Sequence, residues 1–366
     1  MEVLLICVFC VLDLLLFYIF FEGILIPMFF LIGIWGSRER KIRAGYLFFL
    51  YTLFGSLFML LGIIYIFLKT GSTNYEILSS TYFLENEQKF LWLTFFVSFA
   101  SKVPMLPLHI WLPEAHVEAP TSGSVILAGI LLKLGTYGFL RFVLCFFPEA
   151  NYFYTPFVYV LSCLGIIYTS LTAVRQTDLK RVIAYSSVAH MNLVILGLFS
   201  NTFLGLQGAL LQNLSHGFIS SALFLCIGVF YDRYHTRMIK YYSGLVYVMP
   251  LTILILLFFT MANIGLPGTS SFVSEFLILA GLYKSNVIVT FLGATGMILG
   301  GLYSLWLFNR IAYGNLKTQY LGNNFLDLKK NEFFSLFPLI LGTLLLGIYP
   351  ECFLETMHLS VLNLLV

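Results

Sequence analysis

The sequence predicts an all-α protein, a polytopic bundle of membrane-spanning helices. Of its 366 residues, 60% are hydrophobic and 10% are charged, and the mean hydropathy is +0.93. A water-soluble domain carries about 25% charged residues, so this chain has too few polar side chains to cover a globule in water. The composition excludes a soluble enzyme, a secreted disulfide scaffold and a disordered regulator. The net charge of +3 is too small to indicate nucleic-acid binding.

The apolar runs are long enough to cross a bilayer as helices. A span needs about 20 apolar residues, and only helices or closed barrels satisfy their backbone in lipid. The runs do not alternate between apolar and polar residues, so strands are not expected. We expect ten to eleven spans, the first in residues 1–35 and the others near 44–68, 90–112, 121–147, 153–174, 182–199, 203–230, 246–283, 286–309 and 333–350.

The first run, 1–35, is too long for one ordinary span, and Asp13 is expected to mark a turn inside it. Together with residues 36–366 it is predicted to form a single transmembrane domain over 1–366. The loops on the side reached after this first run carry an excess of Lys and Arg, whereas the opposite loops are slightly acidic. By the positive-inside rule, the basic side faces the cytosol or the mitochondrial matrix.

Two spans should be broken inside the membrane. Residues 101–109 contain Pro104 and Pro107, which remove helix hydrogen bonds. Residues 265–271 begin with a Gly-Leu-Pro-Gly sequence that should interrupt the second span. Broken helices are tolerated only where protein or a water-filled cavity satisfies the freed backbone groups. We therefore expect function at both breaks.

Four charged residues fall deep inside the predicted spans: Glu22, Lys102, Lys133 and Glu275. Each costs about 2.5–3.5 kcal/mol at the bilayer centre. Two acids and two bases could form static ion pairs that fix helix packing. Because intramembrane ionisable groups usually line an ion pathway, we favour a proton or ion path.

Two histidines, His190 and His216, fall in mid-span. A neutral imidazole transfers protons readily near pH 7, so both are candidates for the same path, although either could be structural. Gln212 lies one helical turn before His216 and shares its face. The remaining histidines, His109, His116, His235 and His358, are expected near the membrane surfaces.

Cofactor or metal binding by this chain is not expected. Cys7 and Cys10 form a C-x-x-C, but they lie in an apolar run with no second Cys or His pair nearby. The sequence contains no Walker loop and no Gly-x-Gly-x-x-Gly after a strand.

Three segments resemble NADH dehydrogenase subunit 4, the antiporter-like, proton-pumping subunit of mitochondrial respiratory complex I. They are FYIFFE at 17–22, PLHIWLPEAHVEAP at 107–120, and the stretch from Arg175 to Met191. The resemblance covers essentially the whole chain and implies an antiporter-like bundle with two broken helices. It places the pump residues of that family on Glu22, Lys102, Lys133, His190, His216 and Glu275.

The resemblance also implies a place in the cell and a set of partners. It implies a multi-pass protein of the mitochondrial inner membrane with its C-terminus toward the intermembrane space. The expected partners are the antiporter-like subunits 2 and 5, accessory subunits and lipids such as cardiolipin. NAD, FMN, iron–sulfur clusters and ubiquinone are expected in other subunits.

The family has fourteen helices, and this chain resembles it from partway through the fourth. Three explanations remain open: a separate polypeptide supplies the first three helices, the lineage has lost them, or the sequence is incomplete. Three alternative functions are also open. The chain could belong to a multisubunit Na⁺/H⁺ antiporter, act as a non-pumping structural subunit of the membrane arm, or bind quinone directly.

Overall fold

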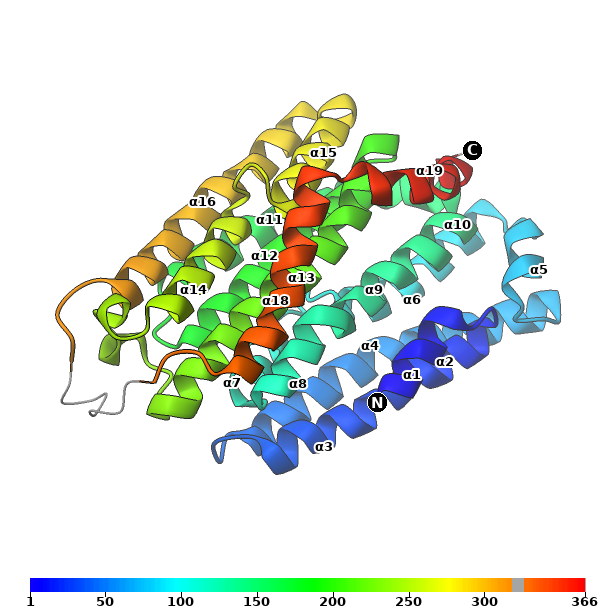
Figure 1. Ribbon diagram of the computed structural model, residues 1–366. Helices are drawn as coiled ribbons and strands as arrows, with labels where there is room; N and C mark the ends of the chain where they lie inside the picture. The colour runs from blue at the N-terminus through cyan, green and yellow to red at the C-terminus, as the bar shows by residue number, and fades with distance from the viewer. Residues whose placement is uncertain (318–325, 366) are drawn as a thin grey trace. The chain divides into compact units, whose positions relative to one another are not determined.

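The computed structural model describes residues 1–317 and 326–365, and over these residues it contains helices but no strand. The predicted all-α class is confirmed (Figure 1). The helices gather into two compact units. The first unit comprises Met1–Gly123 and Ile130–Leu161, and the second comprises Ser124–Gly129 and Ser162–Val366. The single domain over 1–366 stays a prediction.

The first unit begins with three short helices and contains the first of the two helix breaks. Its helices are α1 (Glu2–Cys10), α2 (Leu14–Gly23), α3 (Leu25–Trp35), α4 (Lys41–Thr70), α5 (Tyr75–Ser80), α6 (Glu85–Lys102), α7 (Trp111–Glu118), α9 (Leu132–Gly138), π-helical η2 (Phe139–Val143) and α10 (Leu144–Phe146). Three more segments have residues in both units: α8 (Thr121–Ile126), π-helical η1 (Leu127–Leu131) and α11 (Pro148–Val174).

Asp13 marks the expected turn in the first run. Its Oδ1 accepts hydrogen bonds from the backbone N–H groups of Leu15 (2.8 Å) and Leu16 (3.0 Å), so it caps the N-terminus of α2. An N-cap carboxylate satisfies N–H groups that have no partner within the helix. The polar residue in this apolar run therefore ends α1 and starts α2.

Helix α4 packs against α3, α6 and α7. A Cβ added at Gly62 would lie 2.6 Å from Oγ1 of Thr94, and one added at Gly55 would lie 2.9 Å from Cβ of Ser101. The two glycines thus allow α4 to approach α6 at distances that a larger residue would prevent. This close approach fixes α6, which carries Lys102 at its end.

The second unit is organised around one long helix, α13. Its helices are α12 (Leu179–Leu198), α13 (Phe203–Tyr234), the 3₁₀ turns η3 (Ile239–Tyr241) and η4 (Leu245–Tyr247), α14 (Pro250–Ile264), α15 (Ser270–Ser285), α16 (Val287–Ala312), α18 (Lys330–Ile348) and α19 (Glu351–Leu365). Helix α13 contacts α12, α14, α15, α18 and α19. A Cβ on Gly208 would lie 2.7 Å from the backbone N of Ile278, so α13 and α15 pack almost backbone to backbone.

Both predicted helix breaks are present. Helix α6 ends at Lys102 and α7 begins at Trp111. Helix α14 ends at Ile264, where Gly265 adopts φ +87°, and α15 begins at Ser270. The positive φ is accessible to glycine without a Cβ clash, which explains why the second break starts there.

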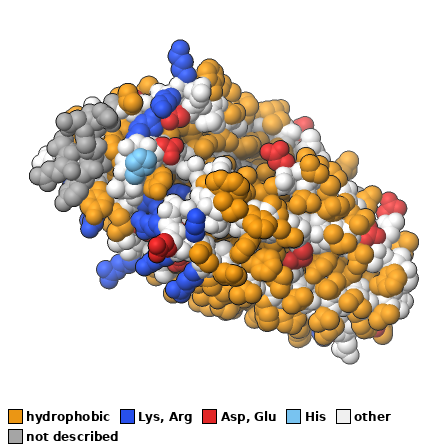
Figure 2. All heavy atoms as spheres, turned by 90° about the horizontal axis from the view of Figure 1, so that it is seen from below, with side chains coloured by type: hydrophobic (Ala, Val, Ile, Leu, Met, Phe, Trp, Pro, Cys, Tyr) orange, Lys and Arg blue, Asp and Glu red, His pale blue; other side chains and the backbone are white. Residues whose placement is uncertain are grey.

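The described residues contain eight helical segments long and apolar enough to cross a membrane, two of them made of consecutive shorter helices, so the predicted count of ten to eleven spans is not confirmed. Part of the difference between the predicted and the observed number of spans comes from helices that end at the two breaks. Helix α14 has 15 residues, and α6 is polar at both ends. Hydrophobic side chains cover most of the visible face in Figure 2, as expected for a surface that contacts lipid.

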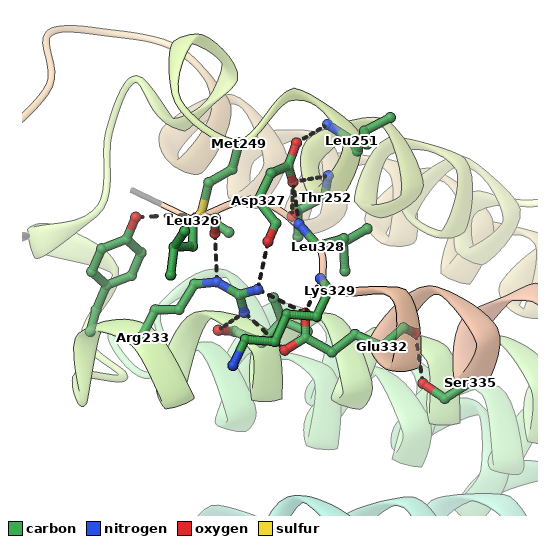
Figure 3. A network of polar contacts seen from close by, with 12 residues as sticks. Arg233, Met249, Leu251, Thr252, Leu326, Asp327, Leu328, Lys329, Glu332 and Ser335 are labelled. Carbon is green, nitrogen blue, oxygen red and sulfur yellow. Dashed lines mark hydrogen bonds and ion pairs between the residues drawn. The ribbon is translucent and has the colours of Figure 1, made fainter. Parts of the chain in front are cut away.

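A polar network in the second unit joins the residues before α18 to α13 and α14 (Figure 3). Arg233, in the last turn of α13, donates to the Glu332 carboxylate (2.7 Å) and to the carbonyl of Asp327 (2.9 Å). Asp327 accepts from the N–H of Leu251 (2.9 Å) and from the hydroxyl of Thr252 (2.7 Å) at the start of α14. The network satisfies the first N–H groups of α14 and fixes where α18 starts.

Candidate functional site

Lys102 is the last residue of α6 and lies at the first helix break. Its side chain is 0% exposed, and its Nζ has no hydrogen-bond partner among the described residues. The ammonium lies 4.6 Å from the ring centroid of Phe21, where an aromatic face attracts a cation. The C-terminal end of a helix also favours a positive charge. Lys102 is thus held by a cation–π contact and a helix terminus, without a direct ion pair among the described residues.

Glu22, on α2, is the acidic group coupled to Lys102. The two side chains interact electrostatically, and the Ser56 hydroxyl is a hydrogen-bonding neighbour of the Glu22 carboxylate. Within the described residues no ion pair of 4.0 Å or less joins Glu22 to Lys102. A coupled pair without a direct contact can change its interaction through a small movement of either side chain.

Lys133 lies on α9, between two π-helical segments, η1 and η2. Single turns of π-helix inside α-helices are rare and are frequent at functional sites. A Cβ on Gly135 would lie 3.2 Å from Cβ of Lys102, so the helix of Lys133 packs closely against the helix of Lys102. The first unit therefore packs the helix of Lys133 against the helix of Lys102, which is itself coupled to Glu22.

Glu275, on α15, is the centre of a second polar cluster, which lies in the second unit. Its Oε1 is 3.3 Å from Nδ1 of His190 and 3.3 Å from Nε2 of Gln212, which donates to it. The Ser274 hydroxyl donates to Oε1 of Gln212, which orients the amide. The His190 and His216 rings lie 6.0 Å apart between centroids. The predicted residues His190, His216 and Glu275 therefore lie together.

The other carboxylate oxygen of Glu275 is buried and has no hydrogen-bond partner among the described residues. Beside this residue lies a cavity of about 20 Å³, lined also by His190, Asn263 and Tyr303, which is enough for about one water molecule. A Cβ on Gly265 would lie 2.9 Å from Oε2 of Glu275. The helix break therefore makes room for the carboxylate.

Two polar residues of this cavity, Asn263 and Tyr303, are absent from the sequence prediction. The Tyr303 hydroxyl has Asn263 and Ser186 as hydrogen-bonding neighbours and interacts electrostatically with Glu275. An asparagine at the end of α14 and a tyrosine on α16 give no recognisable pattern in the sequence. Only the packing of α14, α15 and α16 brings them to the carboxylate.

The described residues contain no group of three or more His, Cys, Asp or Glu that could hold a metal ion. Cys7 and Cys10 lie in the last turn of α1, and Cys10 is exposed. His109 and His116, expected near the membrane surfaces, are buried within the protein, at 8% and 0% exposed.

Comparisons with known proteins identify the family of this chain. The family described as NADH:quinone oxidoreductase/Mrp antiporter, transmembrane, matches residues 12–307. NADH-ubiquinone oxidoreductase chain 4 of Marchantia polymorpha is 61% identical over 363 residues, which cover 99% of this chain and 73% of the relative. The Arabidopsis thaliana protein of the same name is 62% identical with the same coverage.

Solved structures show the same fold. A chain of respiratory complex I from Thermus thermophilus superimposes with a TM-score of 0.92 at 33% identity, over 100% of this chain and 78% of that one. A chain of the Mrp complex from Dietzia has a TM-score of 0.88 at 20% identity, over 99% and 76%; this likeness shows the fold alone. The resemblance found in the sequence is confirmed: the chain belongs to the NADH-ubiquinone oxidoreductase chain 4 family of complex I membrane subunits.

Proposed function

We propose that this chain translocates protons across the mitochondrial inner membrane, driven by NADH oxidation and quinone reduction elsewhere in the complex. The observation that carries the proposal is that ionisable groups lie at both helix breaks. Lys102 is buried with no ion-pair partner at the first break, and Glu275 contacts His190 beside a cavity of one-water size near the second. Intramembrane ionisable groups in such positions usually form proton relays.

The first step depends on the coupled pair of the first unit. While the Glu22 carboxylate is near, it stabilises the ammonium form of Lys102. When Glu22 moves away, or a neighbouring subunit compensates its charge, the buried ammonium loses this support and releases its proton. The close packing of α6 and α9 makes Lys133 the next acceptor.

The second step uses the cluster in the second unit. His216 and His190 transfer the proton toward Glu275, whose Oε1 lies 3.3 Å from Nδ1 of His190. Gln212 orients the carboxylate and takes no proton itself. We propose that the two clusters belong to one antiporter-like domain and one path, on which Glu22, Lys102, Lys133, His190, His216 and Glu275 act in turn.

The proposal includes the surroundings of the chain. The neighbours are the antiporter-like subunits 2 and 5, accessory subunits and membrane lipids such as cardiolipin. This chain binds no redox cofactor, and NAD, FMN, iron–sulfur clusters and ubiquinone are bound by other subunits. The C-terminus faces the intermembrane space, because the basic loops are expected on the matrix side.

The test is proton translocation by the intact complex carrying Lys102→Ala or Glu22→Ala. We expect the complex to assemble and to oxidise NADH, but proton pumping to be abolished. Lys89→Ala is the matched control, since Lys89 lies on the same helix and pairs with Glu85 at 2.6 Å. A normal ratio of protons to electrons in the Lys102 and Glu22 variants would refute the proposal and leave a structural role.

Membership of an active complex is tested by a native gel stained for NADH oxidation, with peptide mass spectrometry on the active band. We expect this chain in that band. Peptides in the same band that resemble the remaining part of the longer relatives would show that this part is present in the complex, on the same or on a separate polypeptide. Migration apart from flavin and iron–sulfur subunits, with cation-dependent dissipation of ΔpH in vesicles, would instead indicate an antiporter.

A further inference from the structure

A basic pocket in the second unit lies apart from the polar cluster around Glu275. It has a volume of about 490 Å³ and lies between η3 and the C-terminal end of α16. Three cationic residues line it: Lys240 on η3, Arg310 in the last turn of α16, and Lys317 after α16. None of the ten lining residues described is acidic. Pockets of this size hold small ligands or headgroups.

The three cationic side chains are available to an external anion, because no acidic side chain of the described residues pairs with them. In the described part of the chain, no ion pair of 4.0 Å or less involves any of them. Arg310 lies over the Trp306 ring at 5.0 Å, and Lys240 lies over the Tyr241 ring at 4.8 Å. One cation in the last turn would complement the helix dipole of α16. The dipole alone does not account for three cations at this place.

The backbone on both sides of the pocket is fixed, so the cations do not depend on a ligand to come together. The N–H of Gly244 donates to the carbonyl of Tyr313 at 3.1 Å, and the Ser243 hydroxyl donates to the carbonyl of Asn315. Nζ of Lys317 donates to the carbonyl of Lys240 at 2.6 Å. A pre-organised site binds its ligand with a smaller loss of conformational entropy.

The pocket lies where a lipid headgroup would lie. Arg310 closes the last turn of α16, a helix of membrane-spanning length, and Trp306, Tyr242 and Tyr313 also line the pocket. Trp and Tyr are enriched at the level of the headgroups, and basic pockets between membrane-spanning helices bind anionic headgroups. The guanidinium fork of Arg310 matches the geometry of phosphate oxygens.

We propose that this pocket, formed by Lys240, Arg310 and Lys317, binds the phosphate of an anionic phospholipid. The same phosphate chemistry could come from free phosphate in solution, but the position at the end of a membrane helix favours the lipid. The bound lipid would hold η3 against α16 and stabilise this end of the second unit.

The test uses the intact complex in vesicles that contain phosphatidylglycerol with a photoactivatable group close to its headgroup. We expect crosslinks in peptides covering 239–247 and 306–317. We expect Arg310→Gln to lower their yield about tenfold, as for the loss of one charge-assisted contact to phosphate. The triple change of Lys240, Arg310 and Lys317 to Gln should remove them, and Arg310→Lys should restore part of the yield in a folded protein.

Lys330→Gln is the matched control, because it removes an exposed lysine outside the pocket. Assembly of every variant is checked on a native gel. Equal labelling by phosphatidylcholine with the same photoactivatable group, or an unchanged yield in the triple variant, would overturn the proposal. Competition by inorganic phosphate alone would assign the pocket to a soluble anion and overturn the lipid as its source.

Discussion

Nδ1 of His190 lies 3.3 Å from Oε1 of Glu275, which joins a histidine of α12 to a carboxylate beside the break between α14 and α15. Gln212 of α13 donates to the same oxygen, also at 3.3 Å. One carboxylate oxygen thus has two partners, whereas the other has none among the described residues. Oε1 thus holds the contacts with His190 and Gln212, whereas Oε2 lies beside the space that Gly265 leaves open.

Replacing Gln212 should test its role in positioning Glu275. We expect Gln212→Met to lower the rate of proton translocation about fivefold to 150-fold, because a buried carboxylate loses a donor worth about 1–3 kcal/mol. NADH oxidation in the uncoupled complex should stay unchanged. The two rates are measured together in vesicles.

Gln207→Met provides the control on the same helix, since Gln207 is buried but has no side-chain hydrogen bond to the described residues. If both variants lowered pumping equally, the effect would come from packing of α13 and not from Glu275.

Alanine substitutions at Gly265 and Gly268 can separate two effects, backbone strain at the helix break and a steric clash with Glu275. Both have positive φ, +87° and +93°, so alanine at either position strains the backbone by about 1–2 kcal/mol. A Cβ at Gly265 would lie 2.9 Å from Oε2 of Glu275, whereas a Cβ at Gly268 meets nothing within 4 Å. We expect both alanine variants to lower thermal stability, and only Gly265→Ala to impair pumping in the assembled complex. Equal pumping in the two variants would show that the space beside Glu275 is not needed.

Gly208 should be intolerant of any side chain. Its Cβ would lie 2.7 Å from the backbone N of Ile278, so Gly208→Ala must push α13 away from α15, at a cost of about 1–3 kcal/mol. The control, Gly33→Ala, places its Cβ in open space on α3 and should be neutral or stabilise by about 0.5–1 kcal/mol. Thermal unfolding of the purified complex and its yield on native gels measure both. A neutral Gly208→Ala would contradict the close packing.

Asp327 should make the start of α14 sensitive to acid. Burial opposes its charge, but hydrogen bonds from the Thr252 hydroxyl and from the N–H groups of Leu251, Leu328 and Thr252 outweigh burial and hold the pKa of Asp327 below its ordinary value of 3.8. A lowered native pKa stabilises the folded form fully above the ordinary value, and this stabilisation is lost as the pH falls through the native pKa.

Hydrogen exchange at the Leu251 and Thr252 amides measures this effect. We expect these amides to be better protected from exchange in the wild type than in Asp327→Asn. This difference in protection should be largest above about pH 5 and should shrink as the pH falls below 3.8. Asp232→Asn, a change at an exposed carboxyl in the same unit, should leave protection unchanged. A difference that is independent of pH would show that the charge of Asp327 has no role.

The features that could be predicted from the sequence are those that depend on whether a residue prefers water or an apolar environment. Long apolar runs predict helices, Asp13 in an apolar run predicts a turn, and Pro104 and Gly265 predict the two breaks. The buried charges could be found for the same reason, because a charge inside an apolar run has few physical explanations.

The rest depends on tertiary packing. The π-helical turns beside Lys133 are shifts in hydrogen-bond register that leave no compositional signal. Tyr303 and Asn263 become part of the cluster around Glu275 only when α14, α15 and α16 pack together. The C-terminal helix α19 was missed because its apolar residues are interspersed with polar ones.

The small cavity beside Glu275 has a consequence for energy conservation. A continuous file of water molecules would let protons leak back down the gradient that the complex creates. A space of about 20 Å³ holds about one water, which is too small for such a file beside Glu275. On the proposed path a proton therefore reaches Glu275 through His190, the side chain that contacts its carboxylate, and the small cavity limits leakage through water.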